Sequence, residues 1–252
     1  MSEARDGRPV GRVVGLWRYP VKSMGGEELA EVEVSWHGFA GDRRWAFVRD
    51  GVVRSGFPWL TLRQREAMGR YRPSFAEPVR PDESPTVVRA PSGTVYDVAD
   101  PALAAELCPD GARVIKQDRG VFDAFPLSLV TVQTIARLGE TIGRRLDVRR
   151  FRPNLVVEAA EDAPFVEDDW VGCVLAIGGL RLRVDKLDGR CVVITIDPVT
   201  GEREPEILRA VVRDRRGCLG VYGSTVEPGR VAVGDPVWIE SSAPPAVALG
   251  GV

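Results

Sequence analysis

The sequence predicts a mainly β protein with a few helices, of the α+β class, organised as two β-rich domains. Short apolar or alternating runs outnumber amphipathic helical segments, and this pattern is typical of strands. These runs do not alternate regularly with helices, which argues against a doubly wound parallel sheet. The 252 residues include 27 glycines and 19 prolines, and so many turn formers favour many short elements over a few long helices. The length suits one large domain or two small ones.

The first half of the chain reads as strands joined by turns. Strands are expected at residues 10–18 and 29–34, and hairpins at 44–55 around Asp50-Gly51 and at 86–98 around Ser92-Gly93. Residues 101–108 predict a short helix, because proline suits a first helical turn. The Pro-rich residues 72–84 predict a loop. A linker near residues 117–122 would divide domains at 8–118 and 119–242.

The second half contains the clearest helix, at residues 131–146. Val132, Ile135, Leu138 and Ile142 share one face of it, and Thr131 can cap it. A second helix is expected at 204–215, and strands are expected at 154–159, 170–178, 180–186 and 191–196, followed by a strand, a turn and a strand at the end. Residues 243–252 are expected to be a disordered tail.

Composition excludes several classes of function. The net charge of -2 gives no basic field, so no nucleic-acid partner is implied. No stretch approaches the ~20 apolar residues of a membrane span, and the first residues lack the apolar core of a signal peptide. A cytoplasmic protein without a membrane partner is therefore expected. The four cysteines form no C-x-x-C motif, so a zinc ribbon and disulfides are not expected.

Histidine is nearly absent, since His37 is the only one. A His-rich metal site cannot be built from one imidazole, and a Ser-His-Asp or Cys-His system could use only His37. If the protein is an enzyme, the chemistry points towards a cofactor. Neither a G-x-G-x-x-G motif after a strand nor a G-x-x-x-x-G-K-[ST] motif is present, so a Rossmann or P-loop nucleotide site is not supported.

Four short motifs carry residue types suited to anion or metal chemistry. Cys191 directly follows Arg190, and a neighbouring cation favours the thiolate that attacks or ligates metal, although a free cysteine is also commonly just a buried small residue. Lys22-Ser23 follows a strand end, and two glycines come shortly after it. A segment of this kind suits phosphate binding; the alternative is a solvated loop. Arg43-Arg44 and the three arginines of residues 149–152 could bind phosphate or carboxylate in two-point fashion, or form surface ion pairs.

Taken in order, these motifs resemble a known family. The segments YPVKS, GDRRWAFV, RFRPNLVV, GRCVVITIDPVTGE and VGDPVWI resemble the MOSC proteins, named after the C-terminal domain of molybdenum cofactor sulfurase. The chain is most similar in arrangement to the version with an N-terminal β-barrel domain, which includes the mitochondrial amidoxime-reducing component and its bacterial relatives. The resemblance covers roughly residues 10–240 and implies a C-terminal MOSC β-barrel.

The resemblance also implies a molybdenum cofactor (Mo-molybdopterin) held between the two domains. It implies that Cys191 is the catalytic metal ligand. The other cofactor-binding positions that it implies are Lys22, Ser23, Arg43, Asp123, Arg152, Asn154, Gly189 and Arg190. Cationic, amide and hydroxyl groups agree in kind with an anionic cofactor, and thiolate sulfur suits a soft metal. On this view Arg190 helps to hold both the thiolate and the cofactor charge.

The sequence departs from the family pattern in three places. Asp188 stands where many relatives have a second cysteine, three residues before Cys191. Ala124 and Phe125 replace a Thr-Ser pair, so two hydroxyl contacts are lost. No C-terminal C-x-x-x-x-C-x-x-C appears, so a fused iron–sulfur domain is not expected and electrons would come from another protein.

The implied function is reduction of small N-hydroxylated or N-oxide compounds, with electrons from a separate flavin or iron–sulfur reductase. Cys191 would tune the metal, and Asp188 is a candidate proton donor. An alternative is a cofactor-binding or sulfur-carrier protein that acts through a persulfide on Cys191. A third reading is a β-barrel interaction module without a cofactor, in which the cysteine is only buried.

Overall fold

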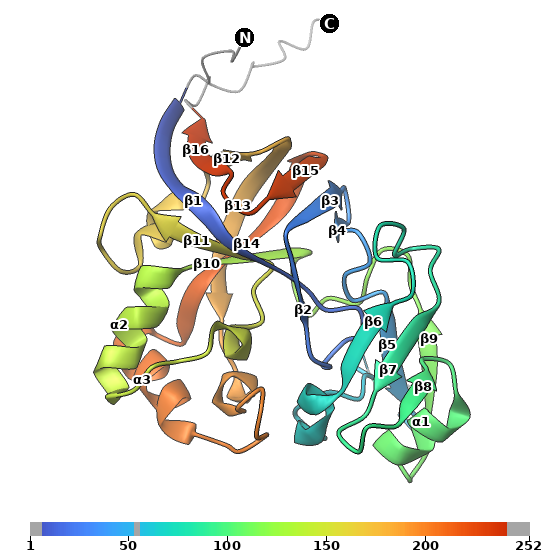
Figure 1. The fold of residues 1–252 in the computed structure, drawn as a ribbon. Helices are drawn as coiled ribbons and strands as arrows, with labels where there is room; N and C mark the ends of the chain where they lie inside the picture. The colour runs from blue at the N-terminus through green and yellow to red at the C-terminus, as the bar shows by residue number, and fades with distance from the viewer. Residues whose placement is uncertain (1–6, 53–55, 241–252) are drawn as a thin grey trace, which may run out of the picture.

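The fold is a closed β-barrel joined to a smaller β-rich lobe, seen in a computed structural model that describes residues 7–52 and 56–240 (Figure 1). The seven barrel strands are β1 (Gly7–Arg18), β10 (Leu127–Thr131), β11 (Leu155–Ala159), β12 (Val174–Ile177), β13 (Leu180–Gly189), β14 (Cys218–Glu227) and β16 (Pro236–Glu240). Their order is β11-β10-β14-β13-β12-β16-β1, and pairing of β1 with β11 closes the sheet. β2 (Glu27–Leu29) extends it beside β1.

The barrel closes because β1 can approach two neighbours at once. Gly11 lies opposite Ala159 of β11 and opposite Val237 of β16. A Cβ atom at Gly11 would lie 2.4 Å from the Glu158 carbonyl oxygen, so the close approach requires glycine there. Inward side chains such as Val13 and Leu16, from β1, fill one hydrophobic core with residues of the other barrel strands.

The small lobe, residues 45–116, has its own core. Its strands are β5 (Trp45–Arg49), β6 (Arg72–Phe75), β7 (Thr86–Arg89), β8 (Val95–Asp97) and β9 (Ala112–Lys116), with the 3-10 helix η1 (Glu66–Arg70) and helix α1 (Pro101–Leu107). β5 pairs with β9, while β6, β7 and β8 form an antiparallel sheet. Phe47, Leu60, Met68 and Leu103 are buried in this core, and Ile196 from the second half of the chain completes it.

Helices cover one end of the barrel. α2 (Val132–Ile142) and α3 (Pro205–Arg215) pack on a third core together with two 3-10 helices, η2 (Val148–Phe151) and η4 (Val192–Thr195). A further 3-10 helix, η3 (Val166–Trp170), contributes Trp170 to the barrel core instead. Thr131 caps α2 by accepting a hydrogen bond from the Thr134 amide, as predicted. A small sheet of β15 (Gly229–Ala232), β3 (Glu31–Ser35) and β4 (Gly38–Phe39) lies beside the barrel.

The mainly β class, the hairpin at 86–98 and all three helices are confirmed. Two element predictions are wrong. Residues 72–75 of the expected loop form β6, in which Pro73 and Phe75 are buried and Ser74 between them is exposed, as in a strand with one buried face. Within residues 191–196, Val192–Thr195 form η4 instead of a strand. Val193 and Ile196, three residues apart, both pack on the small-lobe core while Ile194 packs on the helical core, and this period of three is that of a 3-10 helix.

Other expectations are changed in detail. The expected strand at 29–34 is divided between β2 and β3. In the expected hairpin at 44–55, β5 pairs with β9, and residues 53–55 lie outside the described residues, as does the tail at 243–252. The domain limits 8–118 and 119–242 stay predictions. Strand pairing crosses them, since β1 pairs with β11 and β16, and β3 pairs with β15.

Candidate functional site

A cavity of about 310 Å³ lies between the barrel and the small lobe, and both halves of the chain line it. This volume is at the lower end of the ~300–1,000 Å³ typical of ligand pockets. Every predicted site residue lines it: Lys22, Ser23, Arg43, Asp123, Arg152, Asn154, Gly189, Arg190 and Cys191. The structure therefore brings together positions that are up to 169 residues apart in the sequence (Lys22 to Cys191, 191 − 22).

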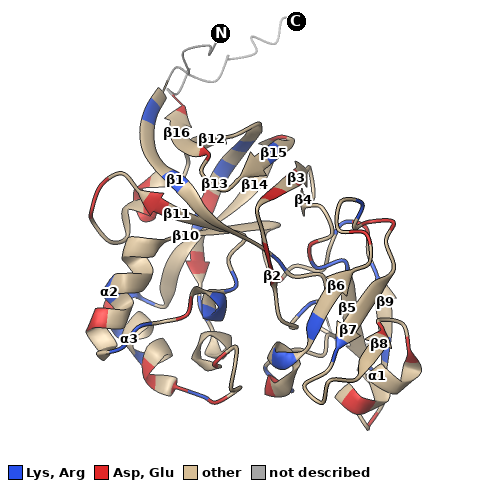
Figure 2. Cartoon of the chain, in the orientation of Figure 1, with Lys and Arg blue, Asp and Glu red and all other residues tan. Residues whose placement is uncertain are grey.

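The cavity wall is strongly basic. Its charged residues are Lys22, Arg43, Arg63, Arg150, Arg152, Lys186 and Arg190 against Asp123 and Asp188. Lys and Arg segments appear on both lobes where these meet (Figure 2). Such a local excess of positive charge, in a chain whose net charge is -2, favours an anionic ligand.

Lys22 and Ser23 belong to the turn that leaves β1. Lys22 is 5% exposed, and its Nζ donates to the Val121 carbonyl at 3.1 Å and to the Asp123 carboxylate. Burial lowers the pKa of Lys22, and Asp123 opposes that shift. Ser23 is buried with φ of 68°, a left-handed conformation that is uncommon for residues other than glycine. Strain of this kind is concentrated at functional sites.

Arg43 and Arg152 both contact the buried ring of Tyr19. Their guanidinium carbons lie 4.8 and 4.2 Å from the ring centroid. Burial, together with the nearby Arg43, lowers the pKa of Arg152 to about 10. One nitrogen of Arg152, Nη2, is buried without a hydrogen-bond partner among the described residues. A buried, unpaired cationic donor is costly, and an anionic group in the cavity would satisfy it.

Asn154 supports Arg43 more than it faces the cavity. It is 1% exposed, and its Nδ2 donates to the Trp17 carbonyl and to Asp42 Oδ2, each at 3.1 Å. Asp42 in turn pairs with Arg43, and although burial would lower the pKa of Arg43, the Asp42 carboxylate raises it. The Asn154 amide, which was predicted to contact a ligand, therefore makes its hydrogen bonds to groups of the protein itself.

Cys191 precedes η4, at the end of β13, and its thiol is partly exposed to the cavity. The cation that touches it is Arg63, from the small lobe, whose Nη2 lies 3.4 Å from the sulfur and 3.2 Å from Asp123 Oδ2. Arg63 is not among the site residues predicted from the sequence. Nothing in LTLRQRE distinguishes Arg63 from Arg65, because the contact depends on how the small lobe meets the barrel.

Arg190 does not hold the thiolate as predicted. Its guanidinium donates to the carbonyls of Leu219 at 2.7 Å and Phe151 at 2.8 Å, and it forms an ion pair with Asp188. Successive side chains of an extended chain point in opposite directions, so a neighbour in sequence is not a neighbour of the sulfur. Arg190 instead links the beginning of β14, at Leu219, to the end of η2, at Phe151. At Gly189 an added Cβ would meet no atom within 4 Å, so the backbone there faces open space.

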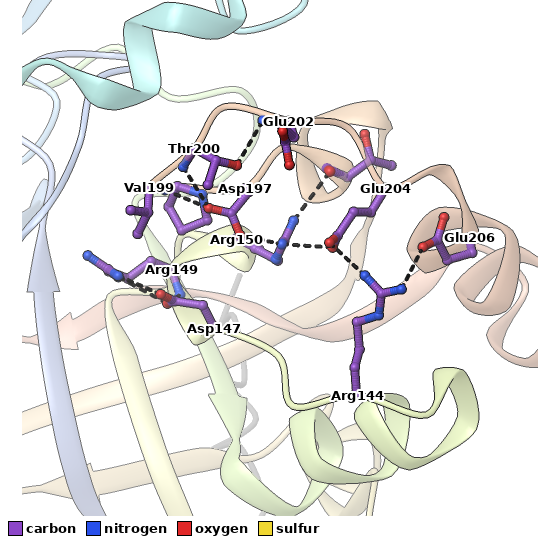
Figure 3. Close-up of polar contacts among 12 residues, drawn as sticks. Arg144, Asp147, Arg149, Arg150, Asp197, Val199, Thr200, Glu202, Glu204 and Glu206 are labelled. Atoms are coloured by element: carbon purple, nitrogen blue, oxygen red, sulfur yellow. Dashed lines mark hydrogen bonds and ion pairs between the residues drawn. The ribbon is translucent and has the colours of Figure 1, made fainter. Parts of the chain in front are cut away.

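Two of the three arginines in residues 149–152 form structural ion pairs. Arg149 pairs with Asp147, and buried Arg150 pairs with Asp197 and Glu204 (Figure 3). Arg150 and Arg152 both line the cavity, and each has one buried nitrogen without a hydrogen-bond partner among the described residues, Nε of Arg150 and Nη2 of Arg152. Arg152 differs in that no carboxylate forms an ion pair with it in the described part of the chain. The surface-pair interpretation is therefore correct for Arg149, and the anion-binding interpretation applies to Arg152.

The remaining wall is aromatic and hydroxylic, and most of it was not predicted. Phe125 lines the cavity and stacks on Tyr222, with ring centroids 6.1 Å apart. Lys186 lies 5.3 Å from the Phe125 ring centroid. The loss of the Thr-Ser pair at Ala124 and Phe125 thus replaces polar contacts with an apolar surface. Ser128 also lines the cavity.

None of the described helices is long and apolar enough to cross a membrane.

Comparisons with known proteins agree with the architecture. A family model described as MOSC domain matches residues 116–238, and one described as MOSC N-terminal beta barrel domain matches residues 10–104. Among solved structures, the YuaD protein of Bacillus subtilis aligns with a TM-score of 0.52 and 16% identity, over 92% of this chain and 97% of that chain. At this identity the likeness supports the fold alone.

Curated relatives align over most of the chain. The chain is 24% identical to mitochondrial amidoxime reducing component 2 of Bos taurus, over 93% of this chain and 86% of the relative. It is 24% identical to the Homo sapiens protein of the same name, over 91% and 83%. It is 25% identical to the molybdenum cofactor sulfurase of Caenorhabditis briggsae, over 86% of this chain but only 34% of that relative.

Proposed function

Because the chain belongs to the MOSC family and carries both its N-terminal β-barrel domain and its MOSC domain, we propose that it is a molybdenum-cofactor-dependent oxidoreductase. Its substrates would be small N-hydroxylated or N-oxide compounds. The observation that carries this proposal is the meeting of unpaired cationic donors and one thiol in a single cavity between the two lobes.

The residues fit the proposed cofactor. Lys22, Arg43 and Arg152 supply positive charge for its phosphate and dithiolene, and the unpaired Nη2 of Arg152 lacks an anion. Cys191 presents a sulfur ligand to the same cavity, and thiolate suits a soft metal. When bound, the cofactor supplies a metal centre that accepts electrons and passes them to the substrate. The protein orients it and encloses it between the two lobes.

The apolar part of the cavity wall offers a surface on which a substrate can bind. Phe125 and Tyr222 form a stacked surface on which a planar organic molecule can lie, and Lys186 stands beside it. The proposal includes a separate flavin or iron–sulfur reductase as electron donor and a cytoplasmic location. The similarity to amidoxime-reducing relatives supports the reductase class.

A second candidate is a cofactor-binding or sulfur-carrier protein that acts through a persulfide on Cys191. The similarity to a molybdenum cofactor sulfurase over 86% of this chain favours it, as does the partly exposed free thiol. Against it, carrying sulfur requires only the thiol, whereas Lys22, Arg43 and Arg152 form a charged cavity drawn from both halves.

The decisive experiment compares the wild-type protein with Cys191→Ala, both purified from a host that makes the cofactor. We expect near-stoichiometric molybdenum in the wild type, loss of most metal in the variant, and reduction of benzamidoxime by reduced methyl viologen only in the wild type. Cys108→Ala is the control, because Cys108 is buried in the small-lobe core.

The other outcomes separate the two candidates. Bound molybdenum without turnover of any N-hydroxylated compound would favour the carrier function. Full activity of the Cys191→Ala protein would refute the assigned ligand, and absence of metal from both proteins would refute cofactor binding.

A further inference from the structure

Asp188, a proton-donor candidate from the sequence, is a buried acidic side chain that the cofactor-binding assignments leave without a role. It lies at the end of β13, three residues before Cys191, and is 1% exposed, yet it lines the cavity. Asp123, the other acidic residue of the wall, is bound by both Lys22 and Arg63. Asp188 is therefore the acidic group of the cavity wall that is not held by two cations.

The two oxygens of the Asp188 carboxyl have different surroundings. Oδ2 accepts a hydrogen bond from Ser128 Oγ at 3.2 Å and lies 2.8 Å from Arg190 Nη2. Arg190 Nη2 is within ion-pair distance but lacks hydrogen-bond geometry, since that nitrogen makes no hydrogen bond in the described part of the chain. It therefore opposes protonation of the carboxyl only in part. Oδ1 is buried and makes no hydrogen bond of good geometry there, although the Tyr222 hydroxyl lies close enough to interact with the carboxyl. A buried carboxylate oxygen without a donor is costly, and a proton on it removes that cost.

The neighbouring elements present four groups to this carboxyl. They are Arg190 on its own segment, Ser128 from β10, Tyr222 from β14 and Arg43 from the turn before β5. Burial raises the pKa of Asp188, and Arg190 and the other groups only partly oppose it. Burial, and then Asp188 itself, also raises the pKa of Tyr222. Both groups thus hold their protons to higher pH than they would in water.

The proposed reaction consumes protons that the cavity must deliver. Reduction of an N-hydroxylated compound follows R–NH–OH + 2 e⁻ + 2 H⁺ → R–NH₂ + H₂O, with both electrons from the flavin or iron–sulfur reductase. The N–O bond breaks and the oxygen leaves as water. General acids contribute about 10²–10⁴-fold to such steps when they are positioned at the reacting group.

We propose that Asp188 is the proton donor of the site, which gives one proton to the departing oxygen and is reprotonated from solvent by way of Tyr222. The second proton comes from solvent. This inference rests on the proposed function. Tyr222 suits the relay because it is partly exposed, lines the cavity and lies against Asp188. Ser128 orients the carboxyl by its hydrogen bond to Oδ2.

The first test does not depend on turnover. Infrared difference spectra of wild type against Asp188→Asn are recorded as a function of pH, and the carbonyl band of a protonated carboxyl is followed. We expect a band that is lost in the variant and persists in the wild type well above the ordinary aspartate pKa of about 3.9. A band that disappears at that ordinary value would overturn the proposal, because an ionised carboxyl cannot donate.

The second test uses protein loaded with molybdenum and reduction of benzamidoxime by reduced methyl viologen. Asp188→Asn is expected to keep its molybdenum and its melting temperature, while kcat falls about 10²-fold or more and loses its decline at high pH. That decline is expected in the wild type because deprotonation of Asp188 removes the donor. Asp188→Glu should recover part of the rate, and Tyr222→Phe should lower kcat less than Asp188→Asn does.

The matched control is Asp185→Asn, a change on the same strand at a residue that pairs with Arg183 and Ser224 outside the cavity. An Asp188→Asn protein with an unchanged rate and pH profile would overturn this inference alone. Loss of molybdenum from that variant would also overturn it, in favour of a cofactor-binding role. A loaded wild type that reduces no N-hydroxylated compound would instead refute the proposed function, and this inference with it.

Discussion

At the scale of single residues, the charged group that contacts the Cys191 thiol comes from the small lobe. Arg63 contacts both the Cys191 sulfur and the Asp123 carboxylate; burial would lower the pKa of Arg63, but the interactions with these two residues raise it. A cation beside the thiol was predicted from the sequence, but it was assigned to Arg190, because adjacency in the sequence was the only available signal. The positions of Lys22, Arg43, Arg152 and Cys191 at one cavity came from the resemblance to a family. Spacing along the chain could not supply them, because their distance in space depends on barrel closure.

Replacing Arg63 by glutamine is therefore expected to change the reactivity of Cys191. In the protein without cofactor, Arg63→Gln should slow alkylation of Cys191 by iodoacetamide about two- to fivefold near neutral pH, because a cation at the sulfur favours the reactive anionic form. This is the range expected for a partly exposed ion pair of up to ~1 kcal/mol, since the Arg63 side chain is 33% exposed. Mass spectrometry of the Cys191 peptide measures the rate. Arg65→Gln removes the same charge from the same segment and should have no effect; an equal effect would show that the contact is unimportant.

At the scale of elements, the η4 segment is held by a buried arginine and not by strand pairing. Arg150 donates to the Thr195 carbonyl at 3.3 Å and pairs with Asp197 and Glu204 on either side of the turn that follows η4 (Figure 3). The helical period of residues 131–146 predicted α2 because one face contacts one core. The run CVVITI gave no such signal. Neighbouring apolar residues of this run pack on two different cores. Such packing on alternate sides is also the pattern of a strand, so the run was predicted as one.

Removing the Arg150 charge should destabilise this half of the molecule. Arg150→Met leaves Asp197 and Glu204 without their buried partner, and breaking a buried pair costs ~3–5 kcal/mol. Because the two carboxylates are 23% and 24% exposed, we expect about 2–3 kcal/mol, or a fall of roughly 5–10 °C in melting temperature. Scanning calorimetry measures it. Arg149→Met is the matched control, since its pair with Asp147 is about one-third exposed and should contribute less than ~1 kcal/mol. Equal shifts in the two variants would contradict the assigned role of Arg150.

At the scale of the whole molecule, the cavity exists because the chain crosses between lobes more than once. β1 belongs to the barrel, yet the turn after it carries Lys22 to the small lobe, where the Lys22 amide donates to the Trp45 carbonyl at 2.8 Å. Ile196 returns from the second half to complete the small-lobe core. Two β-rich parts could be predicted from turn composition. Their shared strands could not, because register and pairing partner depend on contacts between segments more than 100 residues apart.

A ligand that bridges the lobes should stabilise them together. Without an anion, the cationic groups of the cavity repel one another, as the effect of Arg43 on the pKa of Arg152 shows. Protein from a host that makes the cofactor should therefore melt higher than protein from a host that cannot. A ligand present at about 100 times its Kd adds ~2.7 kcal/mol, which corresponds to roughly 5–10 °C for a chain of this size. Lys22→Gln should reduce the difference, whereas Lys116→Gln, a change on β9 outside the cavity, should preserve it. Equal melting temperatures for loaded and empty wild type, with molybdenum present in the loaded sample, would show that the bound group does not join the lobes.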